Sequence, residues 1–245
     1  MGKDESRMQK LQECRVILLD VEGTTTPIEF VRVTLFEYTR EHVRDFIDKN
    51  WSTSNKRGVL NRLWKMMIKD VESGKFTLDG NAENDRENLV KYTNWLLGID
   101  SKASIFKEIQ GLIWQEGYVK GELQGVVYSD VPSALERWSS SGKTVAIYSS
   151  GSELSQKLLF STTPYGDLTI YISEFFDTRI GSKKDPASYT KIAGEIGVKP
   201  NDILFLSDSE EELRAASIAG IKSLLVRRGS KKSKDETVSD FLDLC

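Results

Sequence analysis

Residues 16–26 read VILLDVEGTTT, so that a run of four aliphatic residues ends in two carboxylates one residue apart. The carboxylates are Asp20 and Glu22, and Gly23 and three threonines follow them. A buried strand needs no acidic end for its own stability, whereas a carboxylate in that place can hold a cation or attack an electrophile. This spacing therefore predicts a reactive site at the end of a buried strand.

A further carboxylate, Asp208, stands in the corresponding place after the apolar run ILFLS. Ligands of open α/β sheets bind beyond the carboxyl ends of the strands, so folding would bring Asp20 and Asp208 to one edge. Two carboxylates that lie close repel each other unless a cation separates them, and Mg²⁺ prefers such oxygen ligands. If Asp208 only capped the next helix, Asp20 would be left unexplained. We therefore expect one magnesium ion per chain.

Ser209 and Glu212 follow directly and fit the S-x-x-E capping box. In that motif the two side chains satisfy backbone N–H groups at a helix N-terminus. We therefore interpret Glu212 as a capping residue and not as a ligand.

The serines of the segment SSGS follow another apolar run. Hydroxyls and backbone N–H groups at a helix N-terminus form a natural binding site for phosphate. Ser152 is placed to cap the helix, which leaves Ser149 and Ser150 to face a ligand. Lys183 and Lys184 can add positive charge beside phosphate and clustered carboxylates, although an isolated lysine pair would be a surface feature.

A parallel sheet would bring these clusters together. In the second half of the chain, apolar runs at residues 143–148, 203–207 and 221–226 alternate with segments of helical apolar spacing. Such alternation is typical of a parallel sheet with helices on both faces, and residues 16–19 fit as its first strand. We predict an α/β fold with a Rossmann-like, three-layer parallel-sheet core.

The first and second predicted strands are separated by about 100 residues, which is far too long for a simple βα connection. Apolar residues recur there at spacings of three and four, which predicts helices. The predicted helices cover residues 33–47, 59–71, 87–99 and 104–118, with breaks at Gly74, Asp79–Gly80 and Gly98 and a return path through Gly117, Gly121 and Gly125. We expect a helical cap domain at residues 27–125, inserted into a core formed by residues 1–26 and 126–245.

The bulk properties of the 245-residue chain narrow its partners and its location. A net charge of −3 offers no electrostatic footprint for nucleic acid, and no apolar stretch approaches the roughly 20 residues of a membrane span. Cys14 and Cys245 lack metal-ligand spacing and favour a reducing compartment. We expect a monomer in the cytoplasm, with the nucleus as a second location, and we interpret the basic segment 227–234 as a solvated loop.

The order Asp-x-x-Gly-Thr, Ser-Ser-Gly, Lys with Asp-Pro, and Asp with further acidic residues resembles the haloacid dehalogenase-like superfamily of phosphotransferases. A closer resemblance, to the enolase-phosphatase family of methionine salvage, spans roughly residues 16–228. The segments that carry it are LLDVEGTTTPIEFV, LQGVVYSDV, IYSSGSELSQKLLF, FFDTRIG and ILFLSD, with GLIWQEGY in the insert.

The resemblance implies roles for the acidic residues. Asp20 is the expected nucleophile and a magnesium ligand, forming an aspartyl-phosphate. Glu22 replaces the second Asp of most superfamily phosphatases, and it is expected to reach the metal through its backbone carbonyl and to act as acid and base through its side chain. Asp208 is expected to complete the protein's magnesium ligands. Glu22 is our hypothesis for the enolisation base, with Glu116 second, and His42 is expected only to pack.

The resemblance also implies a substrate and its binding residues. Ser149 and Ser150 match the substrate-binding pair, and Lys183 matches the family lysine better than Lys184 does. The expected reaction converts 2,3-diketo-5-methylthiopentyl 1-phosphate through an enol phosphate to the acireductone 1,2-dihydroxy-3-keto-5-methylthiopentene and phosphate. The alternatives are a general magnesium-dependent phosphatase acting on another small phosphate ester and, in a different class, an inactive scaffold that binds a protein.

Two details stay open at the level of sequence. Phe30, Trp114 and Tyr118 have the size to form an apolar pocket for the methylthio group, but aromatic residues at helical spacing are more often core. The family usually has Arg-Pro-Gly-Asn where this chain has Arg227 to Ser230, so the turn should persist on Gly229 in a more basic and looser loop.

Overall fold

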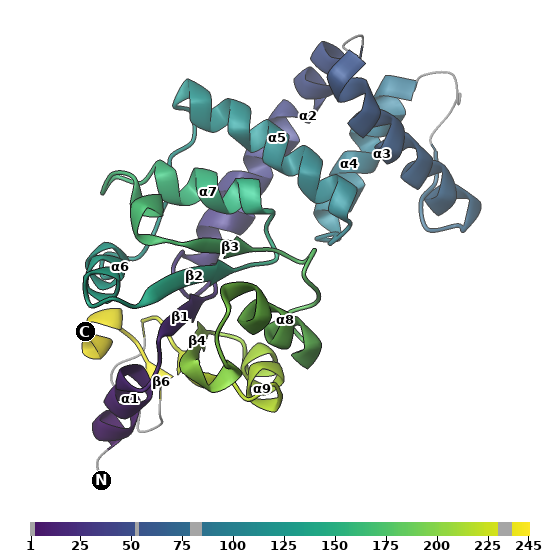
Figure 1. Cartoon of the computed structure of the whole chain (residues 1–245). Coiled ribbons are helices and arrows are strands. Elements are labelled where there is room, and N and C mark those ends of the chain that lie inside the picture. The colour runs from purple at the N-terminus through teal and green to yellow at the C-terminus, as the bar shows by residue number, and fades with distance from the viewer. Residues whose placement is uncertain (1–2, 52–53, 79–84, 230–236) are drawn as a thin grey trace. The chain divides into compact units, whose positions relative to one another are not determined.

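The computed structural model describes residues 3–51, 54–78, 85–229 and 237–245, with the backbone alone for residues 3–6 and 54–57. The chain forms two compact units. The first unit joins Met1–Phe30 to Gln124–Cys245, and the second consists of Val31–Leu123. Figure 1 shows the sheet in the first unit and helices in the second. The insertion of the second unit divides the first at the end of the loop that carries Asp20 and Glu22.

The first unit contains a parallel sheet of six strands in the order β3-β2-β1-β4-β5-β6 (Figure 1). In chain order the strands are β1 Val16–Leu19, β2 Thr144–Tyr148, β3 Glu174–Phe176, β4 Ile203–Ser207, β5 Lys222–Val226 and β6 Thr237–Val238. Leu18 pairs with Ala146 of β2 on one side and with Phe205 of β4 on the other. The predicted α/β parallel sheet is thus confirmed, and β1 lies at its centre.

Helices cover both faces of this sheet. They are α6 Val131–Ser140, α7 Glu153–Ser161, α8 Pro186–Ile196 and α9 Glu210–Ile218. The first unit also contains α1 Lys3–Gln12, which contacts η4 Phe241–Leu244, and 3₁₀ turns at η2 Leu168–Tyr171 and η3 Pro200–Asp202. Helices α8 and α9 pack on one face, where Leu18 and Phe205 meet Tyr189 and Ala216. Helices α6 and α7 contact β2 and β3. Because both faces are covered, the central strands read as continuous apolar runs.

The core fixes the ends of the central strands. The four residues of β1 are at most 1% exposed, and those of β4 are fully buried. Burying one such Leu or Ile side chain contributes about 1.5–3 kcal/mol relative to leaving it exposed. Strands anchored in this way place Asp20 and Asp208 at the carboxyl edge of the sheet.

The second unit is helical, as predicted for the insert. A π-helical turn, η1 Phe30–Leu35, leads into α2 Phe36–Asn50, which is followed by α3 Ser54–Glu72, α4 Asp85–Gly98 and α5 Ser104–Lys120. Gly74 and Gly98 do mark helix ends. The predicted break at Asp79–Gly80 lies outside the described residues.

One predicted glycine role in this unit is wrong. Gly117 lies inside α5 and not on the return path, and α5 ends instead at Gly121, whose φ is 74°. A Cβ on Gly117 would stand 2.6 Å from the ring of Tyr38, so glycine here permits the close approach of α2 and α5. The period of three and four continues through Gly117, which is why the helix continues past it.

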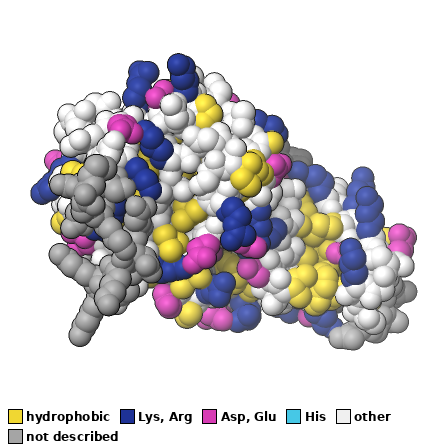
Figure 2. Space-filling model, turned by 90° about the horizontal axis from the view of Figure 1, so that it is seen from below, with side chains coloured by type: hydrophobic (Ala, Val, Ile, Leu, Met, Phe, Trp, Pro, Cys, Tyr) yellow, Lys and Arg dark blue, Asp and Glu magenta, His cyan; other side chains and the backbone are white. Residues whose placement is uncertain are grey.

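Charges on the surface are mixed. On the face shown in Figure 2, acidic and basic side chains lie interspersed with apolar ones. Among the described residues no helix is long and apolar enough to cross a membrane.

Candidate active site

Asp20 follows β1 directly and is only 5% exposed. Its Oδ1 accepts hydrogen bonds from the backbone N–H of Val21 at 2.7 Å and from Nζ of Lys183 at 2.5 Å. Its Oδ2 accepts a hydrogen bond from Oγ of Ser207, the last residue of β4, at 3.1 Å. Donors from three segments therefore hold this carboxylate in one orientation.

Lys183 is 7% exposed and lies between two carboxylates. Its Nζ is 2.5 Å from Asp20 and 2.6 Å from Oε2 of Glu212. Burial by itself would lower the pKa of Lys183, but the two neighbouring charges outweigh it and hold that pKa above its ordinary value. The side chain therefore carries a fixed positive charge in a buried place.

Lys184, its neighbour in sequence, is exposed and pairs with Glu211. The fold thus brings Lys183, and not Lys184, to Asp20. The backbone carbonyl of Lys183 accepts a hydrogen bond from the hydroxyl of Tyr189 on α8, at 2.7 Å. This contact ties the lysine segment to the helix that begins at Pro186.

The capping interpretation of Glu212 is half wrong. Ser209 does cap α9, because its Oγ accepts a hydrogen bond from the backbone N–H of Glu212. The carboxylate of Glu212 instead contacts Lys183, and its Oε2 lies 3.0 Å from Oγ of Ser207, whose single proton can be donated either to Glu212 or to Asp20. Burial, and next the negative charge of Asp20, raise the pKa of Glu212, while Lys183 opposes both. The capping-box pattern could not indicate that Glu212 contacts Lys183, because this partner is 29 positions away in the sequence.

Asp208 follows β4 and is held through its backbone. Its N–H donates to Oγ1 of Thr24 at 3.0 Å, and its carbonyl accepts from Nη1 of Arg227 at 2.7 Å. Among the described residues, no group of another residue donates a hydrogen bond to its carboxylate. Burial and the nearby charge of Asp20 raise the pKa of this carboxyl group.

Gly23 is where the loop after β1 meets Asp208. A Cβ on Gly23 would stand 2.2 Å from Oδ2 of Asp208, and the φ of Gly23 is 74°. Only glycine combines this backbone conformation with so close an approach. The glycine of the opening motif thus brings the two acidic loops into contact.

The site fits a divalent cation with oxygen ligands. The charge of Asp20 helps to raise the pKa of the Asp208 carboxyl group, and the carboxylate of Asp208 lacks a described donor from another residue. The absence of a side chain on Gly23 lets this carboxylate lie against the loop that carries Asp20. Within the described part of the chain, no group of three or more His, Cys, Asp or Glu residues could hold a metal. Mg²⁺ commonly binds through one or two carboxylates with water and substrate phosphate as the other ligands.

The segment after β2 begins α7 at the same edge of the sheet. Ser152 caps α7 as predicted, because its Oγ accepts from the N–H of Ser155. Ser149 is 3% exposed, and its Oγ accepts from the N–H of Gly151 at 3.0 Å. Ser150 is half-buried. The register of β1 with β2 pairs Leu19 with Ile147, which brings this segment and Asp20 to one edge.

The loop from Asp20 to Thr26 is tightly wound. The N–H groups of Thr24, Thr25 and Thr26 all donate to the carbonyl of Val21, at 2.9–3.2 Å. Within this loop Glu22 is half-buried, and its backbone bridges to that of Thr26. Its side chain forms no hydrogen bond or ion pair with a described residue.

The basic segment after β5 departs from the solvated loop that its sequence predicted. The side chain of Arg228 is only 9% exposed and pairs with Asp130 at 2.6 Å. Arg227 is 42% exposed and reaches Asp208 and Glu210. Gly229 does form a turn, with a φ of 75°. Residues 230–234 of the predicted loop lie outside the described residues.

In the second unit, the aromatic candidates belong to the helical core. Nε1 of Trp114 donates to the carbonyl of Leu35 and to Oγ1 of Thr39, so this indole is used within the unit. Tyr118 is 6% exposed. Burial raises the pKa of its hydroxyl group.

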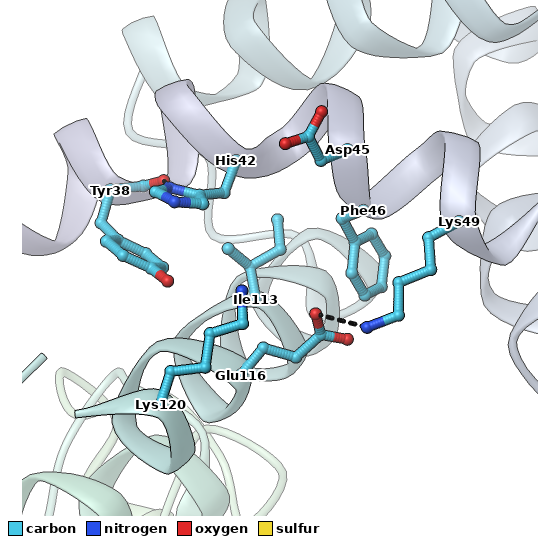
Figure 3. A pocket seen from close by; sticks show the side chains of 8 residues that line it. All are labelled: Tyr38, His42, Asp45, Phe46, Lys49, Ile113, Glu116 and Lys120. Carbon is cyan, nitrogen blue, oxygen red and sulfur yellow. Dashed lines mark hydrogen bonds and ion pairs between the residues drawn. The ribbon is translucent and has the colours of Figure 1, made fainter. Parts of the chain in front are cut away.

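A cavity of about 100 Å³ lies between α2 and α5. Figure 3 shows the side chains that line it. Glu116 faces it and is paired with Nζ of Lys49 at 3.1 Å. The ring of His42 stacks on that of Tyr38 with 3.9 Å between centroids, and the Tyr38 hydroxyl donates to Glu122. His42 is therefore a packing residue, as expected.

Comparison with known proteins assigns this arrangement to a family. Residues 14–220 match the haloacid dehalogenase-like hydrolase family. The chain is 47% identical to Enolase-phosphatase E1 of Sulfurihydrogenibium sp. (strain YO3AOP1) over 84% of each chain, and 42% identical to that of Persephonella marina over 87% of this chain and 88% of the relative. The crystal structure of the UTR4 protein of Saccharomyces cerevisiae matches with a TM-score of 0.71 at 33% identity, covering 93% of this chain and 96% of the other. The chain belongs to the enolase-phosphatase E1 family of haloacid dehalogenase-like hydrolases.

Proposed function

We propose that this protein is a magnesium-dependent enolase-phosphatase of methionine salvage. Its substrate would be 2,3-diketo-5-methylthiopentyl 1-phosphate, and its products the acireductone and phosphate. The observation that carries the proposal is the buried carboxylate of Asp20, held by Lys183 and Ser207 and adjoined by Asp208. The 47% identity to an enolase-phosphatase supports the choice of reaction.

In the hydrolytic step, the carboxylate of Asp20 attacks phosphorus of the enol phosphate, the bond between phosphorus and the enol oxygen breaks, and the acireductone leaves after that oxygen takes up a proton. Water then hydrolyses the aspartyl-phosphate and restores the carboxylate. Lys183 neutralises charge beside the reacting groups, because its buried ammonium lies within hydrogen-bond distance of Asp20. When bound by Asp20, Asp208 and the backbone carbonyl of Glu22, Mg²⁺ would supply polarisation of carbonyl and phosphoryl oxygens.

Phosphate would be bound by the segment after β2. Ser149 and Ser150 precede the N-terminus of α7, whose backbone N–H groups and dipole favour an anion. Their role as the substrate-binding pair is supported by the position of this segment beside β1 in the sheet.

In the enolisation step, Glu22 would remove the proton from C1 of the substrate. Two observations support this role: the side chain is half-buried, and it has no ion-pair partner among the described residues. Glu116, the second candidate, is already paired with Lys49. A Glu22→Gln variant that still exchanged the C1 proton at the wild-type rate would exclude Glu22 as the base.

The helical unit Val31–Leu123 would act as the cap over the substrate. Its compactness supports independent movement as a body, and a lid that closes excludes water from the reaction. We further propose that the enzyme is a cytoplasmic monomer. Sedimentation velocity would test its oligomeric state, and microscopy of the tagged chain would test its location.

The deciding experiment follows the diketo-phosphate with purified protein, with and without Mg²⁺. Enediol absorbance and phosphate release are recorded together for the wild type and for Asp20→Asn. Magnesium-dependent appearance of both products, lost in the variant, is the expected result. Phosphate release from simple esters without turnover of the diketone would leave a general phosphatase and would exclude the proposed substrate.

A further inference from the structure

Arg228 is surrounded by partners from three segments of the first unit. Its Nε and Nη2 both donate to the carbonyl of Thr24, at 2.8 and 2.7 Å. Its Nη1 donates to Oδ2 of Asp130 at 2.6 Å and to the carbonyl of Ser239 at 3.2 Å. All three guanidinium nitrogens thus donate hydrogen bonds within the protein, and the side chain is only 9% exposed to solvent.

Aromatic rings and a second acceptor complete the surroundings. The guanidinium carbon lies 4.4 Å from the ring centroid of Tyr128 and 4.2 Å from that of Phe241. Asp130 also accepts from the backbone N–H of Phe241 at 2.6 Å. Planar contacts of this kind suit arginine and not lysine, whose ammonium is a compact point charge.

The partner that matters for chemistry is Thr24. Its carbonyl is held by Arg228, and its Oγ1 accepts from the N–H of Asp208 at 3.0 Å. Thr24 follows Gly23, which lies against the carboxylate of Asp208. A shift of Thr24 would therefore change the separation of the loop that carries Asp20 from the loop that carries Asp208.

We propose that Arg228 is a positioning residue that acts through Thr24 to fix the distance between Asp20 and Asp208, and with it the affinity for Mg²⁺. This inference rests on the proposed function. Arg228 itself touches neither carboxylate in any described contact; it acts through the loop. The buried pair with Asp130 anchors the guanidinium, so that the two bonds to Thr24 are held in one geometry.

The primary test is Arg228→Lys, which keeps the charge opposite Asp130 but cannot make the forked contact with Thr24. Isothermal titration calorimetry of the full chain with Mg²⁺ alone measures metal affinity without substrate. We expect Kd to rise about 10- to 100-fold, as for other outer contacts of metal ligands. The Mg²⁺ concentration for half-maximal phosphate release should rise by the same factor.

The matched control is Lys143→Met. Lys143 also uses a partly buried cation to hold two backbone carbonyls, those of Leu11 and Cys14, but it precedes β2 at the amino edge of the sheet. The control should lower Tm and leave the Kd for Mg²⁺ unchanged. A purely structural Arg228 would behave in the same way, and that result would overturn the proposal.

Two further variants keep the test decisive. Arg228→Met alone would leave Asp130 buried without its ion-pair partner and risks misfolding. The double variant Arg228→Met/Asp130→Asn is therefore used in place of the single one. Thr24→Val removes the hydroxyl that accepts from the N–H of Asp208. In the double variant Thr24→Val/Arg228→Lys, Kd for Mg²⁺ should rise by less than the product of the two single effects, because both changes act on one loop. Multiplicative effects would contradict a route through Thr24.

The outcomes also separate the two proposals. If the wild type turns over the diketo-phosphate with Mg²⁺ while Arg228→Lys keeps its metal affinity, only the positioning role fails. If the wild type neither binds Mg²⁺ nor releases phosphate, the proposed function fails, and this inference fails with it.

Discussion

Lys183 and Glu212 form a buried ion pair, 2.6 Å from Nζ to Oε2, and both also reach toward Asp20, Lys183 directly and Glu212 through Ser207. The lysine follows a short strand and the glutamate lies in the first turn of α9. The pair closes a small network in which the ammonium of Lys183 donates to both carboxylates, and the hydroxyl of Ser207 lies within hydrogen-bond distance of both with one proton to donate. Removing one member therefore changes the charge seen by the others.

Replacing Lys183 with methionine should abolish most turnover of the diketo-phosphate. Two carboxylates would then face each other in a buried place without their cation, which costs about 3–5 kcal/mol of stability when one partner of such a pair is lost. We expect kcat to fall by about 10²–10³, as for loss of a single electrostatic donor. Steady-state kinetics and urea unfolding measure the two effects.

Lys184→Met is the matched control for this change. Lys184 is the adjacent lysine, but it is exposed and pairs with Glu211 on the surface. Its replacement should leave kcat and the unfolding midpoint close to those of the wild type. Equal losses in both variants would show that general charge, and not the contact with Asp20, matters.

Replacing Glu212 with glutamine should separate its role from helix capping. Glutamine keeps the length of the side chain and the backbone N–H group that donates to Oγ of Ser209. It removes the negative charge opposite Lys183. We expect kcat to decrease about 10- to 100-fold while α9 stays folded, since residues that orient a reactive group have effects of this size. Glu211→Gln, one position away and exposed, should have no effect on kcat. If Glu212→Gln were as active as the wild type, the charge of Glu212 would have no part in turnover, and the residue would serve only at the start of α9.

These residues show how far sequence could go. The run of residues 16–19 predicted β1 because a strand buried on both faces must be apolar throughout. The sequence did not predict β3, because its three residues, Glu174–Phe176, are too few to show a periodic pattern of apolar residues. Glu212 and Arg228 were misread because local patterns, a capping box and a charge run, describe neighbours in sequence, whereas their partners come from distant segments.

Asp177 should make stability depend on pH in the acid range. Burial raises the pKa of its carboxyl group, but hydrogen bonds from the side chain and backbone of Arg179 and from the N–H of Glu153 outweigh it, so that this pKa lies below its ordinary value. A lowered pKa in the folded state adds stability above the unfolded value, about 3.9, and this stability is lost as the pH falls through the folded value.

The Asp177→Asn variant tests this dependence. We expect it to be less stable than the wild type by about 1–2 kcal/mol at pH 7, a modest figure because Arg179 is mostly exposed. The difference should shrink below pH 4. Urea unfolding at a series of pH values measures it, with the exposed Asp243→Asn as control. A difference that stayed constant with pH would mean that lost packing, and not charge, is responsible.

Replacing Gly23 with alanine should damage the site through contact and not only through backbone strain. The variant would place a methyl group 2.2 Å from Oδ2 of Asp208 and would also force a non-glycine residue to a φ of 74°.

Gly142→Ala separates the two effects, because Gly142 has a φ of 80° with nothing within 4 Å of the added Cβ. Both variants should lose about 1 kcal/mol of stability from the strained backbone. Only Gly23→Ala should also weaken Mg²⁺ binding and phosphate release, because it alone moves Asp208. Calorimetry with Mg²⁺ and phosphate assays on both proteins measure the distinction. Equal metal affinity in the two variants would show that the loop of Gly23 yields without displacing Asp208, and the direct contact would then have no part in holding the cation.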